Sequence, residues 1–470
     1  MIPGLLPLSI LFAPLSVFVL LLLAPYSTWC HDLIMNPFVR KLGSFWLIPL
    51  LLTVFPFVRR HLLRRYLAEI GREFAEWQER YIYPTDDFLP TAFIERLHTQ
   101  RRVLLIGQSG LGKTSYFKHL TAFHAGDNKS IQNRKNVVPV FIPLSTYPGG
   151  PPEEFLYDQL SNFGRMTDAE LNKWFLERGG FVILLDGLNE VTDEAKRMQL
   201  SNFVNRHWKA NLFSISSQHA YAEFSALSVV PLEPLNRHKI NIMIRSLLPE
   251  ISAERFIDHL TDEMYRVYGI PRDLEFAIEI FRRCDAGSLP KSRNELYAAA
   301  LSPVIESWLS SGHADFRHRL FSRAYEMLRE REPFFDSQKT PLPDEIVNAL
   351  YDQRFLVKSG SRFHFRHDLV RDFLAAQHFF PRWNTLLAAN DSNIDDNWAE
   401  MLKFAISALV VNCGDDIKPL MEVVLTRSPN KRFVGLLFNW LQETYQANCE
   451  PWEREFKEKF GEAMLDTLTD

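Results

Sequence analysis

The segment that most constrains the fold of this chain is residues 107–114. It follows directly after the short apolar run at residues 103–106. Its sequence, GQSGLGKT, fits the pattern GxxxxGK[ST] in the setting that the pattern requires. Glycines permit a tight turn that points successive N–H groups at bound phosphates, and the helix expected to start near Lys113 adds its positive N-terminal end. The segment therefore predicts a parallel α/β sheet with a phosphate-binding loop after one strand.

The chemistry of this loop assigns a role to its last two residues. Lys113 is expected to contact the β- and γ-phosphates, and the Thr114 hydroxyl is expected to bind Mg²⁺. ATP or ADP and Mg²⁺ are therefore the expected cofactors. The residues of the loop predicted to bind the nucleotide are Gly107, Gln108, Ser109, Gly110, Leu111, Gly112, Lys113, Thr114 and Ser115.

A second apolar run, residues 181–185, ends in the acidic segment DGLNE at residues 186–190. A strand here would deliver Asp186 to the C-terminal edge of the sheet, where ligands collect in open α/β folds. There its carboxylate could hold the magnesium through water. Glu190 is the natural base to orient an attacking water if the nucleotide is hydrolysed. The predicted metal residues are thus Thr114 and Asp186, and the predicted catalytic residues are Lys113 and Glu190.

The N-terminus contains two apolar runs. The first 30 residues carry no charged side chain, and residues 5–23 are long enough and apolar enough to cross a bilayer. Residues 42–58 form a second run, which Arg59, Arg60, Arg64 and Arg65 follow directly. Because positive residues remain on the cytoplasmic side, the pattern predicts a two-pass integral membrane protein with the bulk of the chain in the cytoplasm. A cleaved signal peptide is the alternative for the first run, although no positive region precedes it.

An apolar stripe follows the second run at helical spacing, and it predicts a helical linker over residues 61–84. Two interpretations are open for this stripe: packing on its own domain, or a short coiled coil that joins protomers. Its residues are Leu63, Leu67, Ile70, Phe74, Trp77 and Tyr81.

Length, net charge and cysteine spacing limit the number of folded units and the classes of function expected of this chain. A chain of 470 residues exceeds the size of a single core, so several folded units are expected. The net charge of -4 argues against a dedicated nucleic-acid binder. The four cysteines lie far apart and form no CxxC pair, so neither a disulfide framework nor a zinc site is indicated.

With both motifs in place, the chain resembles the NACHT family of signal-transduction ATPases, which belong to the STAND class. The similarity includes the strand VPVFIPL at residues 138–144, the acidic box DGLNE, and VPLEPL at residues 230–235. It extends over residues 85–380. The family includes animal innate-immune receptors and bacterial defence proteins, so the resemblance implies a nucleotide switch, with antiviral defence in a bacterium as the leading biological interpretation.

Two later segments gain meaning from this resemblance. Residues 269–271, GIP, look like the family element whose proline, here Pro271, packs on the adenine. Residues 365–367, FRH, followed by DFLAA at residues 372–376, look like the winged-helix signature whose histidine, here His367, reaches the β-phosphate of ADP and locks a closed state. From the residues alone, Pro271 would mark a helix start and His367 a capping or packing residue.

One position departs from the family pattern. The segment LFSISSQ, residues 212–218, has the expected polar strand end, but Gln218 stands where the family usually carries arginine. A neutral amide cannot offset developing phosphate charge as a guanidinium does, so slow hydrolysis or binding without turnover is expected. The chain is thus a weak ATPase at most. Asn189 likewise leaves fewer carboxylates in the acidic box than the family's fuller form.

The predicted fold class is an α/β P-loop NTPase core with a parallel sheet, followed by a helical domain and a winged helix, with an N-terminal transmembrane hairpin and C-terminal helices. The C-terminal part shows helical periodicity without a recognisable repeat. The predicted domains are two transmembrane helices at 1–60, a juxtamembrane linker at 61–84, the nucleotide-binding domain at 85–235, a small helical domain at 236–300, a winged helix at 301–380 and a helical domain at 381–470.

The function expected from these parts is a membrane-anchored switch that ADP holds closed and ATP releases to form a homo-oligomer. The expected partners are the lipid bilayer, further copies of the chain and an unidentified trigger, at the inner membrane if the source is bacterial. One alternative is a membrane scaffold whose nucleotide site is structural. A second is a membrane-bound winged-helix regulator, against which the acidic segment 344–353 offers few phosphate contacts, so no nucleic acid is expected.

Overall fold

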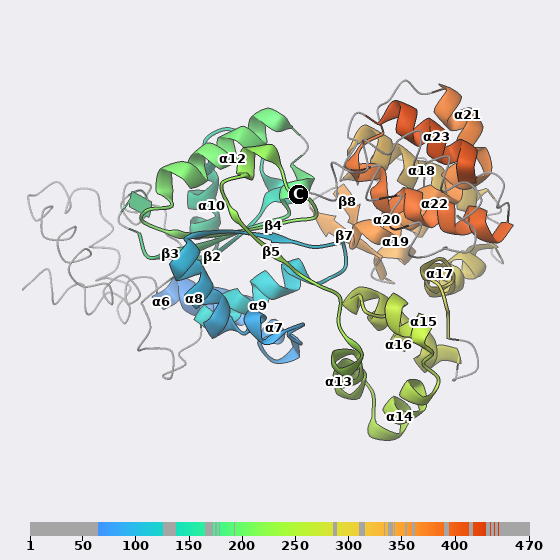
Figure 1. Ribbon diagram of the computed structural model, residues 1–470, viewed down its shortest axis with the longest axis horizontal. Coiled ribbons are helices and arrows are strands. Elements are labelled where there is room, and N and C mark those ends of the chain that lie inside the picture. The colour runs from blue at the N-terminus through green and yellow to red at the C-terminus, as the bar shows by residue number, and fades with distance from the viewer. Residues whose placement is uncertain are drawn as a thin grey trace, which may run out of the picture. The chain divides into compact units, whose positions relative to one another are not determined.

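The computed structural model divides the chain into two compact units, Met1–Pro234 and Leu235–Asp470 (Figure 1). It describes residues 64–125, 138–164, 173, 176–177, 179–191, 193–284, 289–309, 315–332, 334–336, 342, 344–352, 355–359, 362–389, 394–412, 417–428, 433, 437 and 440. Each unit is described by itself below.

The first unit contains a five-stranded sheet in the order β2-β3-β4-β1-β5, in which every neighbouring pair is parallel. Its strands are β1 (Arg102–Ile106), β2 (Val138–Pro143), β3 (Phe181–Asp186), β4 (Leu212–Ser217) and β5 (Ser228–Pro231). The central strands β3 and β4 are buried along their whole length, as expected for a parallel sheet covered on both faces. One strand, β4, separates the strand before the loop from the acidic strand.

Helices cover both faces of this sheet, with α10 and α12 on one side and α8 and α9 on the other (Figure 1). The helices are α6 (Arg64–Glu73), α7 (Ala75–Arg80), α8 (Pro90–Gln100), α9 (Lys113–Ala125), α10 (Pro152–Gly164) and α12 (Glu194–His207), with one-turn helices η2 (Asp86–Phe88), η3 (Leu144–Thr146), η4 (Leu188–Glu190) and η5 (Ala222–Phe224). Local chemistry sets several starts: Pro90 occupies the first turn of α8, and the Asp193 carboxylate caps α12 by accepting from Ala195 N.

The predicted linker is part of this unit. Of the apolar stripe, Leu67, Ile70 and Phe74 are buried, and the helix is interrupted at Phe74 between α6 and α7. The Tyr66 hydroxyl donates to the carbonyl of Pro139 in β2, at 2.9 Å. These side chains pack on their own unit, which is the first of the two interpretations of the stripe.

The second unit is mainly helical and carries one small sheet. Its helices are α13 (Arg237–Leu247), α14 (Glu250–Asp258), α15 (Asp262–Val267), α16 (Pro271–Cys284), α17 (Arg293–Leu309), α18 (Phe316–Glu330), α19 (Asp344–Asp352), α20 (Asp368–Phe379), α21 (Trp383–Ala389), α22 (Ala399–Asn412) and α23 (Ile417–Arg427), with the short helices η7 (Phe380–Arg382) and η8 (Asp396–Trp398). The strands β6 (Phe335–Asp336), β7 (Leu356–Ser359) and β8 (Arg362–Phe365) pair antiparallel in the order β6-β8-β7. A helix followed by a β-hairpin is the local arrangement expected of a winged helix.

The two apolar runs of the N-terminus, residues 5–23 and 42–58, lie outside the described residues. Among the helices that the structure does describe, none combines the length and the apolar character needed to cross a membrane. The transmembrane hairpin and the expected localisation therefore remain predictions.

Candidate nucleotide site

The loop between β1 and α9 has the backbone that the glycine spacing predicted. Gly110 and Gly112 have φ angles of 84° and 92°, a region that side chains with a Cβ rarely adopt. Gly107 is required for a different reason: a Cβ there would lie 3.0 Å from the carbonyl oxygen of Leu232. The loop is therefore closely packed at its start and left-handed at two later positions, and α9 begins at Lys113.

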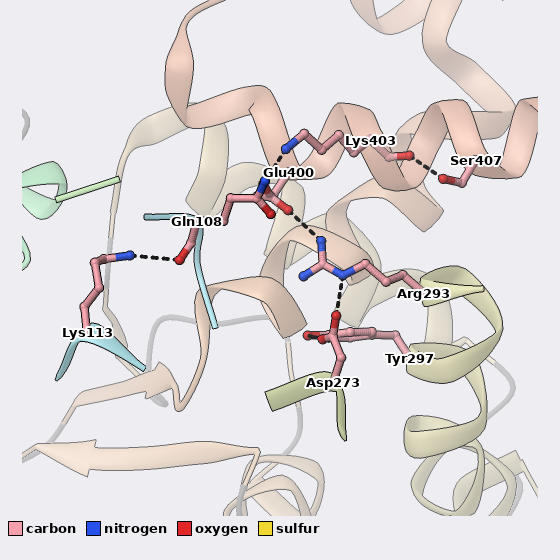
Figure 2. A network of polar contacts seen from close by, with 8 residues as sticks. All are labelled: Gln108, Lys113, Asp273, Arg293, Tyr297, Glu400, Lys403 and Ser407. Carbon is pink, nitrogen blue, oxygen red and sulfur yellow. Dashed lines mark hydrogen bonds and ion pairs between the residues drawn. The ribbon is translucent and has the colours of Figure 1, made fainter. Parts of the chain in front are cut away.

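The Lys113 side chain folds back over the loop. Its ammonium donates to the backbone carbonyls of Gly107 and Gln108, the latter at 2.9 Å (Figure 2). An ammonium held at the loop backbone is placed for a negatively charged ligand, because it can exchange these carbonyls for phosphate oxygens.

Asp186 ends β3 at the same edge of the sheet. In the registers of the parallel strands, Ile106 lies opposite Ser217 and Leu185 opposite Ile215, so the C-terminal ends of β1, β3 and β4 coincide. The Asp186 carboxylate, with a relative exposure of 7%, accepts a hydrogen bond of 2.6 Å from the Ser216 hydroxyl. The Ser216 hydroxyl in turn accepts from the N–H of Gly187, at 2.8 Å. Ser216 thus fixes the orientation of the carboxylate.

The protonation of Asp186 depends on opposing effects. Burial raises the pKa of this carboxyl, and hydrogen bonds from Ser216 and Thr114 and the charges of Lys113 and Lys118 lower it. Burial is the largest of these effects. The hydrogen bond between Thr114 and Asp186 brings together the two residues predicted to serve the metal.

The residues present fit magnesium. Within the described part of the chain, no group of three or more His, Cys, Asp and Glu side chains is placed to hold a metal by itself. Mg²⁺, however, usually takes one or two protein oxygens and completes its shell with water and substrate phosphates. The Thr114 hydroxyl and the Asp186 carboxylate supply oxygen donors of that kind.

Glu190 lies on η4, one turn beyond Asp186. Gly187 has a φ of 83°, and a Cβ at this glycine would lie 2.8 Å from Oε1 of Glu190. The exposed Glu190 carboxylate therefore folds over the Gly187 backbone. The left-handed backbone at this position favours glycine, which gives the residue after Asp186 a physical role that its sequence position alone did not show.

Gln218 follows directly after β4 and is half-buried at the same sheet edge. Its role as the residue at the family's arginine position stays a prediction. No arginine stands at this strand end, so the reasoning about slow turnover applies to the residue that the fold presents there.

Pro271 and His367 belong to the second unit, whereas the loop residues, Asp186 and Glu190 belong to the first. Pro271 is the first residue of α16, and His367 is the residue before α20, with extended backbone at a φ of -139°. Both side chains are half-buried. Their proposed contacts with adenine and with the β-phosphate stay predictions.

A buried ion-pair network in the second unit was not found by sequence reasoning. Arg293, at the start of α17, donates to Asp273 on α16 at 2.6 Å and to Glu400 on α22 at 3.0 Å (Figure 2). Tyr297 donates to the other oxygen of Asp273 at 3.0 Å, and Lys403 donates to Glu400 at 2.9 Å. Arg293 and Glu400 are 107 positions apart in the sequence. No local sequence pattern therefore predicts the network.

Protonation in this network is governed by burial and by the neighbouring charges. Burial raises the pKa of Asp273, which is fully buried, and the charge of Arg293 opposes this. The pKa of Glu400 is lowered to about 2, because Lys403 and Arg293 outweigh the effect of burial. Glu400 is therefore ionised at neutral pH, and through Arg293 it links α22 to α16, the helix that begins with Pro271.

No protein-family model matches the sequence, and no curated protein matches it either. Among solved structures, a STAND protein with a tetratricopeptide repeat sensor from Pyrococcus horikoshii matches at 14% identity and a TM-score of 0.34, over 80% of this chain and 57% of that one. The chain therefore spans little more than half the length of that protein. A Walker-type ATPase of Pyrococcus abyssi matches at 13% identity and a TM-score of 0.32, over 63% and 99% of the two chains. Domain III of the replication initiation protein DnaA of Thermotoga maritima matches at 16% identity and a TM-score of 0.28, over 48% and 95%.

The class of the first unit follows from its own fold and loop. A parallel sheet, a GxxxxGKT loop between β1 and α9, and an acidic residue at the end of β3 beside the loop threonine define a P-loop NTPase core. The first unit is a P-loop NTPase core, and a mainly helical unit follows it.

Proposed function

We propose that this chain is a nucleotide-controlled switch of the STAND class that binds ADP and ATP with Mg²⁺. The observation that carries the proposal is the arrangement of Lys113, Thr114 and Asp186 at one sheet edge. The Lys113 ammonium, the Thr114 hydroxyl and the Asp186 carboxylate lie beside the loop. Two glycines of this loop, Gly110 and Gly112, have left-handed backbone. This set of groups suits a nucleoside polyphosphate and its metal better than any other ligand class.

The residues of the first unit have distinct tasks in this proposal. Lys113 leaves the carbonyls of Gly107 and Gln108 and bonds the phosphate oxygens, while the loop N–H groups hold the phosphates in place. Thr114 and Asp186 would hold Mg²⁺, which supplies charge neutralisation at the phosphates when bound. Ser216 keeps the Asp186 carboxylate oriented through its 2.6 Å hydrogen bond.

Hydrolysis in this proposal is slow. The exposed Glu190 carboxylate orients a water for attack on the terminal phosphate. Gln218 at the end of β4 carries no charge, so it contributes little to stabilising the charge that develops in the transition state. The nucleotide then acts mainly through which state it favours and less through turnover.

The wider switch extends the proposal beyond the nucleotide core. The family resemblance supports it: Pro271 packs on the adenine, His367 contacts the β-phosphate of ADP, and exchange for ATP removes that contact and favours an open state. Open chains assemble and cluster their N-terminal transmembrane hairpins in the bilayer, as a defence effector would. An innate-immune or antiphage role and NACHT membership rest on this resemblance alone.

The experiment that tests the switch is the identity of the nucleotide that copurifies with the full chain, together with its mass in solution before and after addition of ATP and Mg²⁺. The proposal expects ADP in a monomer that assembles when ATP is added. An assembly whose size does not change with nucleotide would contradict the switch.

The second candidate function is a membrane scaffold with a permanently occupied, structural nucleotide site. Gln218 favours it, because the strand end lacks a charged group that distinguishes three phosphates from two. The scaffold predicts a fixed assembly in the same experiment and equal affinity for ADP and ATP, since a ligand with equal affinity for two states shifts neither.

A further inference from the structure

The segment before the nucleotide core lies along the helix that begins at the phosphate loop. We define this strap as residues 66–83, which cover most of α6, all of α7 and the extended residues after it. At the C-terminal end of α9, a Cβ on Gly71 would lie 3.4 Å from Cβ of Ala125. At the N-terminal end, Cε2 of Tyr81 lies 3.9 Å from the Cβ position of Gly112. The strap therefore runs along α9 from its last residue to the loop.

His119 joins the strap to α9 with both of its ring nitrogens. The side chain is almost fully buried, with a relative exposure of 1%. Nδ1 lies 2.8 Å from the carbonyl oxygen of Trp77, and Nε2 lies 2.7 Å from the hydroxyl of Tyr83. A carbonyl only accepts, so Nδ1 carries the proton, and burial, which lowers the pKa of His119, keeps the ring neutral. Nε2 then accepts from Tyr83, which fixes the tautomer of His119.

Aromatic and cationic contacts strengthen the same junction. The Tyr81 ring stacks on His119 with centroids 5.2 Å apart and planes at 20°. Lys118 lies over the rings of Phe74 and Trp77, at 5.9 and 5.3 Å from their centroids. The strap is thus attached at several points of α9, with the two hydrogen bonds of His119 at its centre.

The N-terminal turn of α9 is also the part that must change when a ligand arrives. Lys113 donates to two loop carbonyls and has to release both in order to reach a phosphate. His119 is six residues further along the same helix, about 9 Å of helix axis. A helix transmits such a change as a body, because its backbone groups are bonded along its length.

We propose that His119 is a positioning residue that couples the occupancy of the phosphate loop to the strap, and through it to the N-terminal segment that precedes residue 64. This inference rests on the proposed nucleotide binding. Binding at the loop fixes the first turn of α9, and the fixed helix holds Trp77 and Tyr83 through His119. Through the strap, the occupancy of the nucleotide site thus affects the N-terminal segment, where the two apolar runs lie.

The test is amide hydrogen exchange of the full chain, measured by mass spectrometry with and without ADP and Mg²⁺. In the wild type, ADP and Mg²⁺ should slow exchange in residues 107–116 and also in residues 74–83, the latter by about fivefold or more, the lower range of coupling between sites. His119→Phe keeps a ring for Tyr81 to stack on and removes both hydrogen bonds. It should keep the slowing in residues 107–116 and lose it in residues 74–83.

Two further variants keep the test decisive. Tyr83→Phe removes a single hydroxyl and should weaken the effect in residues 74–83, which decides the matter if His119→Phe does not fold. Thr121→Val is the matched control, because this buried hydroxyl donates to the carbonyl of Phe117 in its own helix, at 2.7 Å, and should behave as the wild type.

The outcomes separate this inference from the proposed function. Slowing in residues 74–83 that survives both His119→Phe and Tyr83→Phe would overturn the coupling role and leave nucleotide binding intact. The same holds if the wild type is protected in residues 107–116 but unchanged in residues 74–83. A wild type without protection in residues 107–116 would refute the proposed function, and the inference with it.

Discussion

Ser216→Ala should show how much the hydrogen bond that orients Asp186 contributes to stability and to magnesium binding. The Ser216 hydroxyl donates to the carboxylate at 2.6 Å and accepts from Gly187 N at 2.8 Å, with a relative exposure of 1%. The substitution leaves a buried carboxylate without one of its donors and a backbone N–H without its acceptor. A hydrogen bond to a charged group contributes about 1.5–3 kcal/mol, and an unsatisfied buried group costs about 1–3 kcal/mol. We therefore expect the free energy of unfolding to fall by roughly 2–4 kcal/mol.

The same substitution should weaken magnesium binding. Burial already raises the pKa of Asp186, and the hydrogen bond from Ser216 is one of the effects that lower it. Without that bond, the proton competes with the metal at higher pH than in the wild type. The Mg²⁺ dependence of nucleotide binding should thus shift to higher Mg²⁺ concentration, and the shift should grow as the pH falls.

Ser214→Ala is the matched control. Ser214 lies two residues earlier on β4, on the same face of the sheet, and is fully buried. Within the described part of the chain, its hydroxyl has no hydrogen-bond partner. Its removal should change stability by less than about 0.5 kcal/mol. Chemical denaturation and a Mg²⁺ titration at fixed nucleotide measure both effects, and equal behaviour of the two alanine variants would refute the reasoning.

Four further predictions follow from the same geometry. Gly112→Ala places a side chain on backbone with a φ of 92°, at a cost of about 1–2 kcal/mol in stability, and should lower nucleotide affinity in a binding titration. Unchanged affinity and stability would contradict the assignment of this loop as the phosphate-binding loop. Glu190→Gln should retain nucleotide binding and slow hydrolysis by about 10²-fold or more in a phosphate-release assay, and full turnover would exclude Glu190 as the base. Arg293→Met leaves buried carboxylates without their cation and should lower the free energy of unfolding by about 3–5 kcal/mol in thermal or urea unfolding. Arg245→Met breaks an exposed ion pair and should change it little, and similar losses in the two variants would show that the network is not stabilising. Burial raises the pKa of Asp372 from 3.8 to about 7, so its contribution to stability is fully present below pH 3.8 and is lost as the pH rises through 7. Asp372→Asn should flatten this decline between about pH 4 and 7 in pH-dependent unfolding, and an unchanged slope would contradict the assignment.

The nucleotide core was predictable because its chemistry is local. The apolar run before Gly107, the glycine spacing of the loop and the apolar strand before Asp186 each lie within a few consecutive residues. Backbone geometry and side-chain roles follow from such short segments, since the loop imposes its own φ angles and a parallel strand delivers its last residue to the sheet edge.

The residues that sequence reasoning missed act over long separations. Ser216 was seen only as part of a polar strand end, and its bond to Asp186 spans 30 positions. Arg293 bonds residues on two other helices, α16 and α22, and His119 bonds a carbonyl 42 positions earlier. Such contacts depend on how elements pack, and neither hydrophobic period nor spacing encodes them. The stripe of the linker was visible in the sequence, but its partner, α9, was not.

The central claim is that the loop at residues 107–114 binds a nucleotide through Lys113. Its most direct test is an equilibrium titration of the full chain with a fluorescent ATP analogue and Mg²⁺, repeated with Lys113→Ala and with Lys209→Ala, which removes an exposed lysine of the same unit. The account predicts that Lys113→Ala weakens binding by at least about 30-fold, roughly 2 kcal/mol, and that Lys209→Ala binds as the wild type does. Full affinity in Lys113→Ala, or no saturable binding in the wild type, would contradict it.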